Sequence, residues 1–398
     1  MNIENMLSNK VKDLEGSAIR EMFKLMAKPE IISFAGGSPD SALFPNKELA
    51  EIAAEILTTN GAQALQYGVT EGYPKLLDWV KNRLKNQGIT SEDDDTIIVS
   101  GGQQGIDLAA KSLLNEGDGV ICEQPSFIGG LNCYRSYNAE LYGVNVDDDG
   151  INIEELEEIL KAHNNIKILY TIATFQNPSG ITMSLEKRKK VLELAEKYDF
   201  IIFEDNPYGE LRFTGEPVPT IKSMDKNGRV VYFGSFSKIL SPGMRIGFVS
   251  CTPELLKKMV ICKQVQDVHT PVLTQMMAYE FVTRYSIDEH IKKISKVYGE
   301  KCQYMIKLMD EKFPKCVKHT NPEGGLFLFC TMPDGVDSKE IMKKAIDKNV
   351  AFVPGATTMI DDKKTYSCFR MNYSMASFEQ IEKGINILAE VLHEALGE

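Results

Sequence analysis

A lysine, two serines and an arginine follow a short apolar stretch near the middle of the sequence. Residues 230–234 are apolar and partly β-branched, which predicts a buried strand, and Ser235, Ser237 and Lys238 come directly after them. Apolar surroundings lower the pKa of a lysine, and a neutral amine can attack a carbonyl to form a Schiff base. The serine hydroxyls and the guanidinium of Arg245 suit a phosphate dianion. The stretch therefore predicts a site for an aldehyde that carries a phosphate, with a solvated turn as the other interpretation.

Two other enzyme classes share parts of this pattern. The Ser-x-x-Lys of serine acyl-transferring enzymes matches Ser235-Phe236-Ser237-Lys238, but that class also needs Ser-Asp-Asn and Lys-Thr-Gly. The chain has neither, because Lys364-Thr365 is followed by Tyr366. The Gly-Lys-Ser/Thr ending of a phosphate-binding loop is absent as well. The rest of the chain must decide between the remaining interpretations.

The composition is that of a globular protein of 398 residues, long enough for two domains. Its net charge of −11 argues against nucleic-acid partners and against a basic membrane-binding face. The eight cysteines form no Cys-x-x-Cys pair and mostly lie in apolar runs, which indicates reduced, buried thiols in a cytoplasmic protein. We expect no signal peptide, no membrane span and no metal site, because the chain shows no pattern for them.

A glycine-rich turn supplies a candidate anion site. Residues 96–99 read as a buried strand, which runs into Ser100-Gly101-Gly102-Gln103 and then a helix to about Leu114. Free backbone N–H groups and the positive end of the helix dipole point at one place there. The turn lacks the Gly-x-Gly-x-x-Gly pattern of dinucleotide binding. Many such turns bind nothing, so this signal needs support from the rest of the chain.

The pattern of the first 250 residues favours an α/β fold with a largely parallel sheet. Apolar strands are expected near 119–123, 140–146, 166–172, 200–204 and 230–234, with helices near 126–137, 153–163 and 184–198. Ligands of such sheets bind beyond the carboxyl ends of the strands. Polar and aromatic residues lie at those predicted ends: Phe127, Asn177, Asp205, Tyr208 and Lys238.

The remaining sequence predicts a second, smaller α+β unit. Helices are expected near 253–268 and 271–285, and a long helix at 287–312 would join the two units. Strands near 323–329, 351–355 and 368–374 and helices near 337–349 and 378–396 follow. An amphipathic helix is expected over about 3–28. We predict an N-terminal segment that covers the active site (1–45), a large domain (46–286) and a small C-terminal domain (287–398).

Taken together, the motifs resemble those of the class I/II aminotransferases of PLP fold type I, where PLP is pyridoxal 5′-phosphate. The resemblance covers essentially the whole chain and is greatest to the 2-aminoadipate, kynurenine and MocR aminotransferase-like branch. It implies a mostly parallel seven-stranded sheet between helices, plus a small α+β domain. The motifs that carry it are Ile32-Ser33-Phe34-Ala35-Gly36-Gly37, Tyr67-Gly68-Val69-Thr70-Glu71-Gly72, Ser100-Gly101-Gly102-Gln103-Gln104, Asn177-Pro178-Ser179-Gly180, Asp205-Asn206-Pro207-Tyr208, Ser235-Phe236-Ser237-Lys238 with Arg245, and Arg370.

The resemblance implies roles for the residues around the cofactor ring. Lys238 would hold the cofactor aldehyde as an imine and, once freed, move the proton between the substrate Cα and the cofactor. Asp205 would pair with the ring nitrogen, and Tyr208 and Asn177 would hydrogen-bond the phenolic oxygen. Phe127 would stack on the ring where the family often has tyrosine, although core packing would also explain it.

Other residues would bind the cofactor phosphate, again by resemblance. Tyr67 would reach the phosphate of a neighbouring subunit, which requires a homodimer with shared active sites. The other predicted phosphate ligands are Gly102, Gln103, Ser235, Ser237 and Arg245.

The resemblance also implies how an amino-acid substrate is bound. Arg370 would grip the α-carboxylate bidentately, with Asn177 beside it. Gly37 would let the backbone approach the substrate, or it simply makes a turn. Arg20 lies in a segment similar to one in the aminoadipate branch, where that arginine meets a side-chain carboxylate; an exposed helix arginine is the other interpretation.

We therefore expect an aminotransferase that moves an amino group between an L-amino acid and a 2-oxo acid such as 2-oxoglutarate. The expected donors are glutamate, 2-aminoadipate, and aromatic or branched-chain amino acids. A PLP-dependent carbon–sulfur β-lyase would share Lys238, Asp205 and Arg370, so the residues alone leave it open. A non-catalytic PLP-sensing module of a transcription regulator is the third interpretation. It fits poorly with a similarity that begins within the first 20 residues and with a negative net charge.

Overall fold

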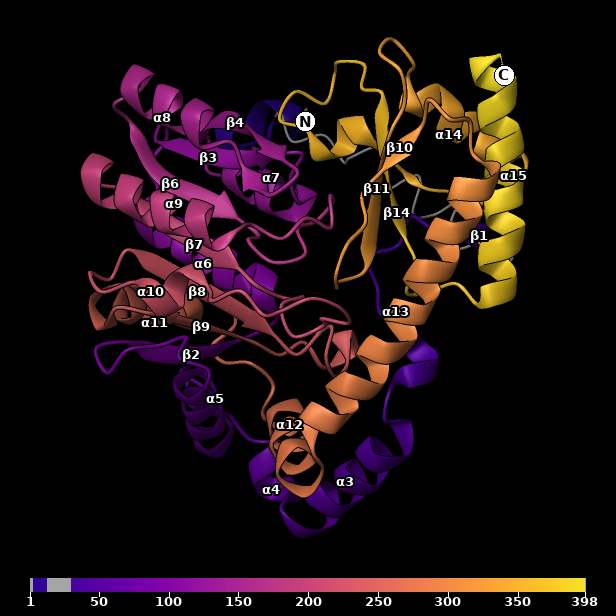
Figure 1. Ribbon diagram of the computed structural model, residues 1–398. Helices are drawn as coiled ribbons and strands as arrows, with labels where there is room; N and C mark the ends of the chain where they lie inside the picture. The colour runs from indigo at the N-terminus through magenta and orange to yellow at the C-terminus, as the bar shows by residue number, and fades with distance from the viewer. Residues whose placement is uncertain (1–2, 13–29, 398) are drawn as a thin grey trace.

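The computed structural model describes residues 3–12 and 30–397. Its largest sheet has eight strands in the order β2-β9-β8-β7-β6-β3-β4-β5 (Figure 1). Strands β3, β4, β6, β7 and β8 pair in parallel, whereas β9 is antiparallel to both of its neighbours. The strands are β2 (Asp95–Val99), β3 (Gly119–Gln124), β4 (Glu140–Asp147), β5 (Gly150–Ile151), β6 (Ile166–Thr171), β7 (Ile201–Asp205), β8 (Val230–Ser235) and β9 (Gly247–Cys251). The expected mostly parallel sheet is confirmed, with the two-residue β5 as an additional edge strand.

Helices cover both faces of this sheet because its strands are apolar on both sides. Along β6, Ile168 and Tyr170 belong to one hydrophobic core and Leu169 to a second core on the opposite face. Helices α8, α9 and α10 pack on the face of the second core, and α6, α7 and α11 on the other. Their bounds are α6 (Gly102–Leu113), α7 (Ile128–Arg135), α8 (Ile153–Ala162), α9 (Leu185–Tyr198), α10 (Ile221–Met224) and α11 (Pro253–Gln266).

A second, four-stranded antiparallel sheet in the order β10-β11-β14-β13 forms the C-terminal part of the chain. The long helix α13 (Ile287–Lys312) runs diagonally from α12 (Val272–Arg284) to this sheet (Figure 1). The side chain of Ser286 caps α13, and a buried apolar stripe that includes Ile287, Ile291 and Ile294 sets its orientation. The remaining elements are β10 (Lys318–His319), β11 (Phe327–Thr331), β12 (Val350–Ala351), β13 (Val353–Pro354), β14 (Cys368–Asn372), α14 (Ser338–Asp347), η4 (Gly355–Thr358) and α15 (Phe378–Leu396).

The N-terminal segment joins the C-terminal part of the chain. Strand β1 (Ile32–Ser33) pairs in parallel with β12, and the Asn372 N–H donates to the Phe34 carbonyl at 2.6 Å. This pairing places the following residues, through Gly37, beside β14. The other helices are η1 (Ile3–Met6), α1 (Asn9–Lys12), η2 (Ser41–Leu43), α3 (Asn46–Thr59), α4 (Gly61–Ala64), α5 (Pro74–Asn86) and η3 (Pro242–Met244).

Two expectations about the elements were wrong in detail. The strand expected at 323–329 begins only at Phe327, because Gly325 has φ +75° and so makes a turn instead of extended backbone. The described part of the helix expected over 3–28 consists of η1 and α1, two separate short helices. Among the described residues, no helix has both the length and the apolar character needed to cross a membrane.

Candidate active site

The carboxyl ends of β6, β7 and β8 meet at a cavity of about 240 Å³. Strand ends of this kind are the usual ligand sites of parallel sheets. Segments from the N-terminal part and from β14 contribute to the same cavity, so residues far apart in the sequence come together. Every predicted site residue except Tyr67 and Arg20 lines it: Gly37, Gly102, Gln103, Phe127, Asn177, Asp205, Tyr208, Ser235, Ser237, Lys238, Arg245 and Arg370.

Lys238 lies just beyond β8 and extends into the cavity. Its neighbours Phe236 and Ile239 are buried and anchor this turn in the core. The Lys238 Nζ donates a hydrogen bond of 2.7 Å to the Gly37 carbonyl. Burial, together with the positive charge of Arg370, lowers the pKa of Lys238 to about 8. The side chain is therefore partly in its neutral, nucleophilic form near physiological pH.

Asp205 is the last residue of β7, and it is buried at the floor of the cavity. Its Oδ2 accepts a hydrogen bond of 2.8 Å from the Tyr170 hydroxyl. Burial raises the pKa of Asp205 to about 7, and the nearby Glu123 carboxylate adds to this, whereas the Tyr170 hydroxyl opposes it. A cationic group in the cavity would favour the charged form of Asp205.

Asn177, Tyr208 and Arg370 form a chain of hydrogen bonds along one wall. The Asn177 Nδ2 donates to the Tyr208 hydroxyl at 3.3 Å, and the Arg370 Nη1 donates to the Asn177 Oδ1 at 2.9 Å. Arg370 comes from β14, and its Nη2 donates to the Ala35 carbonyl at 2.6 Å. Its guanidinium lies 4.3 Å from the centre of the Phe327 ring, while its Nε is buried without a partner. A buried, unpaired N–H of an arginine is a fitting donor for a carboxylate ligand.

The turn before α6 and Arg245 form the polar end of the cavity. Gly101 has φ +86°, and a Cβ at this position would overlap the Arg245 guanidinium. Arg245 itself adopts the left-handed conformation with φ +54°, a strained geometry that often accompanies binding sites. The N–H groups of Gly102 and Gln103 at the start of α6, the Arg245 cation and the hydroxyls of Ser235 and Ser237 suit a phosphate.

Phe127 and Gln103 lie together beside this polar end. The half-buried Phe127 ring lies against Gly129, where a side chain would overlap the ring. The Gln103 amide donates a hydrogen bond of 3.0 Å to the Gly129 carbonyl, so its side chain fixes the loop that carries Phe127. Gln103 therefore has a backbone N–H near the cavity, but its amide is already engaged elsewhere.

The two other predicted site residues do not line the cavity. Tyr67 is 79% exposed and lies edge-on against the His269 ring at 5.7 Å. Arg20 lies outside the described residues.

Several further residues belong to this site, and the sequence pattern does not predict them. For Tyr170 the pattern predicts only a strand, although a tyrosine in a buried strand needs a partner for its hydroxyl. Ser126 also lines the cavity, and its buried hydroxyl has no hydrogen-bond partner. Val353, Thr357 and Thr358 contribute a further wall from β13 and η4, for which the sequence carried no signal beyond a Pro-Gly turn.

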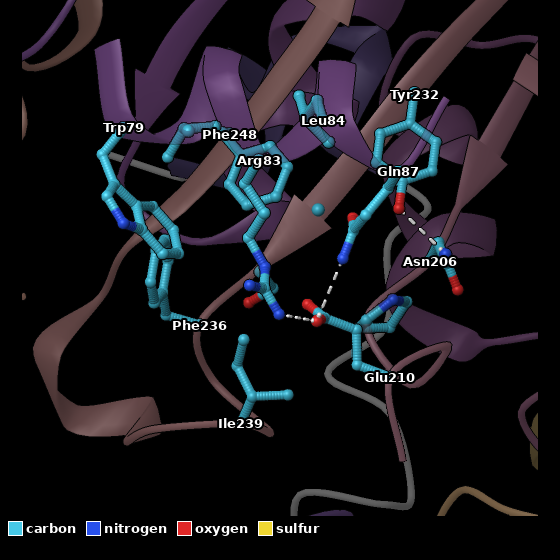
Figure 2. A pocket seen from close by; sticks show the side chains of 14 residues that line it. Trp79, Arg83, Leu84, Gln87, Asn206, Glu210, Tyr232, Phe236, Ile239 and Phe248 are labelled. Carbon is cyan, nitrogen blue, oxygen red and sulfur yellow. Dashed lines mark hydrogen bonds and ion pairs between the residues drawn. The ribbon is translucent and has the colours of Figure 1, made fainter. Parts of the chain in front are cut away.

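A second, much smaller pocket lies behind the loop that carries Tyr208. Figure 2 shows the Glu210 carboxylate paired with Arg83 and, at 3.4 Å, with the Gln87 amide. The Asn206 amide donates to the Tyr232 hydroxyl at 2.9 Å in the same view. With a volume of about 20 Å³, the pocket holds about one water molecule. These contacts hold the loop that carries Tyr208 from behind, and the pocket is too small for an amino acid.

The cavity has a suitable group for each functional part of PLP. Lys238 suits the aldehyde and Asp205 suits a protonated ring nitrogen, because its Oδ2 alone is hydrogen-bonded. The Gly101 turn and Arg245 suit the phosphate, since the absence of a side chain at Gly101 leaves the cradle open. The unpaired Nε of Arg370 suits the carboxylate of an amino acid.

The chain matches the family Aminotransferase class I and II over residues 29–388. It is 40% identical to aromatic-amino-acid aminotransferase 1 of Thermococcus litoralis, with 100% of this chain and 96% of that protein aligned. Its structure is similar to the multiple substrate aminotransferase from Thermococcus profundus, with 39% identity, a TM-score of 0.95 and 100% of both chains covered. It is also similar to the α-aminoadipate aminotransferase of Thermus thermophilus, complexed with N-(5′-phosphopyridoxyl)-L-leucine, with 34% identity, a TM-score of 0.91 and 100% of both chains covered.

The family match and the similarity extend over nearly the whole chain, including every strand end that lines the cavity. They agree with the fit of the cavity to a phosphorylated aldehyde and an amino acid. We conclude that the chain belongs to the class I and II aminotransferases and is a PLP-dependent enzyme that moves an amino group between an L-amino acid and a 2-oxo acid.

Proposed function

We propose that the enzyme accepts a broad range of donors: glutamate, 2-aminoadipate, and aromatic and branched-chain amino acids, with 2-oxoglutarate as an acceptor. The observation that carries this proposal is the cavity in which Lys238, Asp205 and Arg370 face one space. The similar proteins support the breadth, because their names include aromatic amino acids, multiple substrates and α-aminoadipate.

In the proposed mechanism Lys238 has two tasks. It would hold the cofactor aldehyde until a substrate amine displaces it, and the freed amine would then take the proton from the substrate Cα and pass it to the cofactor. The bound PLP supplies an electron-poor ring that stabilises the charge left on Cα. The lowered pKa of Lys238, about 8, suits both tasks because the neutral amine is accessible near physiological pH.

Asp205, Tyr208 and Asn177 orient the cofactor ring in this proposal. The Asp205 carboxylate would keep the ring nitrogen protonated, and Tyr208 and Asn177 would hydrogen-bond the phenolic oxygen. Burial raises the pKa of Tyr208, so its hydroxyl remains a neutral donor. Phe127, which lines the cavity, would stack on the ring.

The phosphate and the substrate carboxylate would be bound by different sets of residues. Arg245 supplies the positive charge for the phosphate, and the remaining phosphate ligands are Gly102, Gln103 through its backbone, Ser235 and Ser237. Arg370 and Asn177 bind the α-carboxylate, and Gly37 lines the space beside them. Burial lowers the pKa of Arg370 to about 10, and a carboxylate ligand favours its charged form.

Substrate breadth follows from the charges that the described part of the cavity contains. Its cations are Lys238, Arg245 and Arg370, each of which already has a task. The wall from Val353 to Thr358 is small and mostly uncharged, so apolar side chains fit it. We propose that Arg20 binds the second carboxylate of glutamate and 2-aminoadipate.

We further propose a homodimer in which Tyr67 reaches the phosphate site of the neighbouring subunit. Tyr67 lies on a surface where large apolar side chains are exposed, which is typical of a subunit interface. Leu65 is 73% exposed, Val69 55% and Val268 46%, and Val268 adjoins His269, which Tyr67 contacts. A second copy of the chain is the proposed occupant of this surface.

Mixing two variants tests this arrangement. Lys238→Ala has no imine lysine, and Tyr67→Ala lacks the phosphate contact; a mixed dimer rebuilds one complete site from both chains. Reassociated mixtures should therefore recover PLP affinity and activity above either variant alone. A monomer in sedimentation analysis, or no recovery on mixing, would contradict the shared site.

We also propose a cytoplasmic location and three domains, with boundaries at 1–45, 46–286 and 287–398. Most of the eight cysteines are buried, which supports a reducing compartment. Limited proteolysis would test the boundaries through cleavage near residues 45 and 286.

The substrate proposal is tested with a panel of amino donors and 2-oxoglutarate, using the purified holoenzyme. Production of 2-oxo acids from glutamate analogues, aromatic and branched-chain donors would support it. Activity on a single donor class would overturn the proposed breadth. Release of pyruvate and ammonia from cystathionine without any 2-oxo acid would indicate a β-lyase as the main activity.

A further inference from the structure

The two oxygens of the Asp205 carboxylate have different surroundings. Oδ2 accepts the 2.8 Å hydrogen bond from the Tyr170 hydroxyl, and both side chains are buried. Oδ1 has no hydrogen bond to any described residue, and it is absent from the set of fully buried, unpaired atoms. Because Asp205 lines the cavity, Oδ1 is the oxygen accessible to a ligand.

The strand register brings the Tyr170 hydroxyl to this carboxylate. Tyr170 on β6 lies opposite Phe203 on β7, and Asp205 lies two residues further along β7 on the same face. With neighbouring strands about 4.8 Å apart and a rise of about 3.3 Å per residue, such diagonal positions are about 8 Å apart, a distance that a tyrosine side chain spans. The hydroxyl therefore reaches Asp205 along the face of the sheet that α7 covers, and Tyr170 does not line the cavity.

The Tyr170 ring has little freedom to move. It is fully buried and packs edge-on against Tyr134 at 5.6 Å. A Cβ at Gly130 would lie 2.9 Å from the Tyr170 ring, so the glycine provides the space that the ring needs. The direction of the hydrogen bond is thus fixed by packing.

The Tyr170 hydroxyl can only act as a neutral donor to Asp205. Burial raises the pKa of Tyr170 well above its usual value, so the phenol keeps its proton. The other charged or titratable groups around Asp205 are Glu123 from β3 and Lys238 after β8, with Tyr134 on α7 and Tyr208 and Tyr232 farther out. Glu123 disfavours the charged carboxylate, whereas the Tyr170 hydrogen bond and Lys238 favour it.

We propose that Tyr170 is a positioning residue for the transamination reaction: it holds Asp205 Oδ2, stabilises the carboxylate, and thereby presents Oδ1 to the cofactor ring nitrogen. This inference rests on the proposed role of Asp205. Without the Tyr170 hydroxyl, the carboxylate would rotate more freely and would be less stable in its charged form. The ring nitrogen would then hold its proton less firmly.

Tyr134 provides a matched control. Its ring is as buried as that of Tyr170 and contacts it, yet its hydroxyl is buried without a hydrogen-bond partner. Tyr134→Phe and Tyr170→Phe each remove one buried hydroxyl from the same core. Only Tyr170→Phe removes a contact to Asp205.

The experiment compares both variants with the wild-type protein by three measurements: PLP affinity of the cofactor-free protein, the pH midpoint of the holoenzyme's colour change, and the unfolding temperature. Loss of a hydrogen bond to a charged group should weaken PLP binding of Tyr170→Phe by about tenfold or more. The pH midpoint of its colour change should rise. A protonated ring nitrogen repels a second proton on the nitrogen that joins Lys238 to the cofactor, and this repulsion should be weaker in Tyr170→Phe. Tyr134→Phe should change neither property.

Equal effects of the two variants would overturn the proposal, since loss of core packing would then explain both. An unchanged midpoint and PLP affinity in Tyr170→Phe would overturn it as well.

The variant Asp205→Asn tests the proposed role of Asp205 separately from that of Tyr170. If Asp205→Asn has a large effect and Tyr170→Phe has none, Tyr170 is not a positioning residue but the role of Asp205 stands. If Asp205→Asn has no effect either, both proposals fail. The double variant should bind PLP no more weakly than Asp205→Asn alone, because Tyr170 acts through Asp205.

Discussion

Replacing Arg370 by lysine tests how the enzyme recognises an α-amino acid. The guanidinium is buried, and its two Nη atoms donate to the Asn177 side chain and the Ala35 carbonyl. This leaves the Nε and the second hydrogens of the Nη atoms for a carboxylate in the cavity. Lysine keeps the positive charge but lacks the planar fork, so it cannot form two parallel hydrogen bonds.

The expected loss follows from one missing charge-assisted hydrogen bond. Such bonds contribute about 1.5–3 kcal/mol. At about 1.4 kcal/mol for each factor of ten, kcat/KM for an amino acid should fall by about 10- to 150-fold. Asn177 or Ala35 would also lose a donor, and this part of the loss is independent of the substrate carboxylate.

A pair of substrates separates these two contributions. Phenylalanine and 2-phenylethylamine share the aromatic side chain and the amine, but only phenylalanine has the carboxylate. Single-turnover colour changes measure how fast each one reacts with the holoenzyme. In Arg370→Lys the rate for phenylalanine should fall by the factor above, relative to the rate for the amine. An equal fall for both compounds would refute a contact between Arg370 and the carboxylate.

Three further predictions concern the lysine, the phosphate turn and the acidic substrates. The rate at which cofactor-free protein captures PLP should rise through a midpoint near pH 8, because burial lowers the pKa of Lys238 to about 8 and only the neutral amine attacks; a midpoint near the ordinary lysine value of about 10.4 would contradict this. Gly101→Ala should weaken PLP binding by about tenfold or more, because it forces φ +86° on alanine and overlaps Arg245, whereas a Cβ at Gly102 meets nothing within 4 Å; equal affinities of the two alanine variants would count against the phosphate site. Arg20→Ala should reduce kcat/KM for glutamate and 2-aminoadipate far more than for leucine or phenylalanine, and an equal reduction for all four would remove its proposed role.

The large-sheet architecture could be predicted because its signals are local. Each central strand is a short apolar run, and the 26-residue helix α13 has a capping serine followed by regularly spaced apolar residues. The strand positions that were not predicted correctly depend on pairing between segments and on local backbone conformation. Strand β5 has only two residues and exists because it pairs with β4, and β11 starts late because of the backbone at Gly325.

The same distinction separates the site residues that could be predicted from those that could not. Lys238 and Asp205 were found because a parallel sheet gathers the carboxyl ends of its strands. Tyr170 lies inside a strand, and which polar group it meets depends on the register between β6 and β7. The sequence also cannot show that the Gln103 amide bonds the Gly129 carbonyl, because that contact depends on how α6 and α7 pack.

The electrostatics of the cavity indicate why an acid and an amine are kept apart there. Burial raises the pKa of Asp205 to about 7 and lowers that of Lys238 to about 8. Direct pairing would shift both pKa values in the opposite directions, so desolvation outweighs the attraction between them. Each group is therefore biased towards its neutral form. A ligand with a cationic ring nitrogen would favour the charged form of the carboxylate, and the neutral amine would be available to an aldehyde on the same ligand. A ligand that carries both a cationic nitrogen and an aldehyde would therefore suit both groups at once.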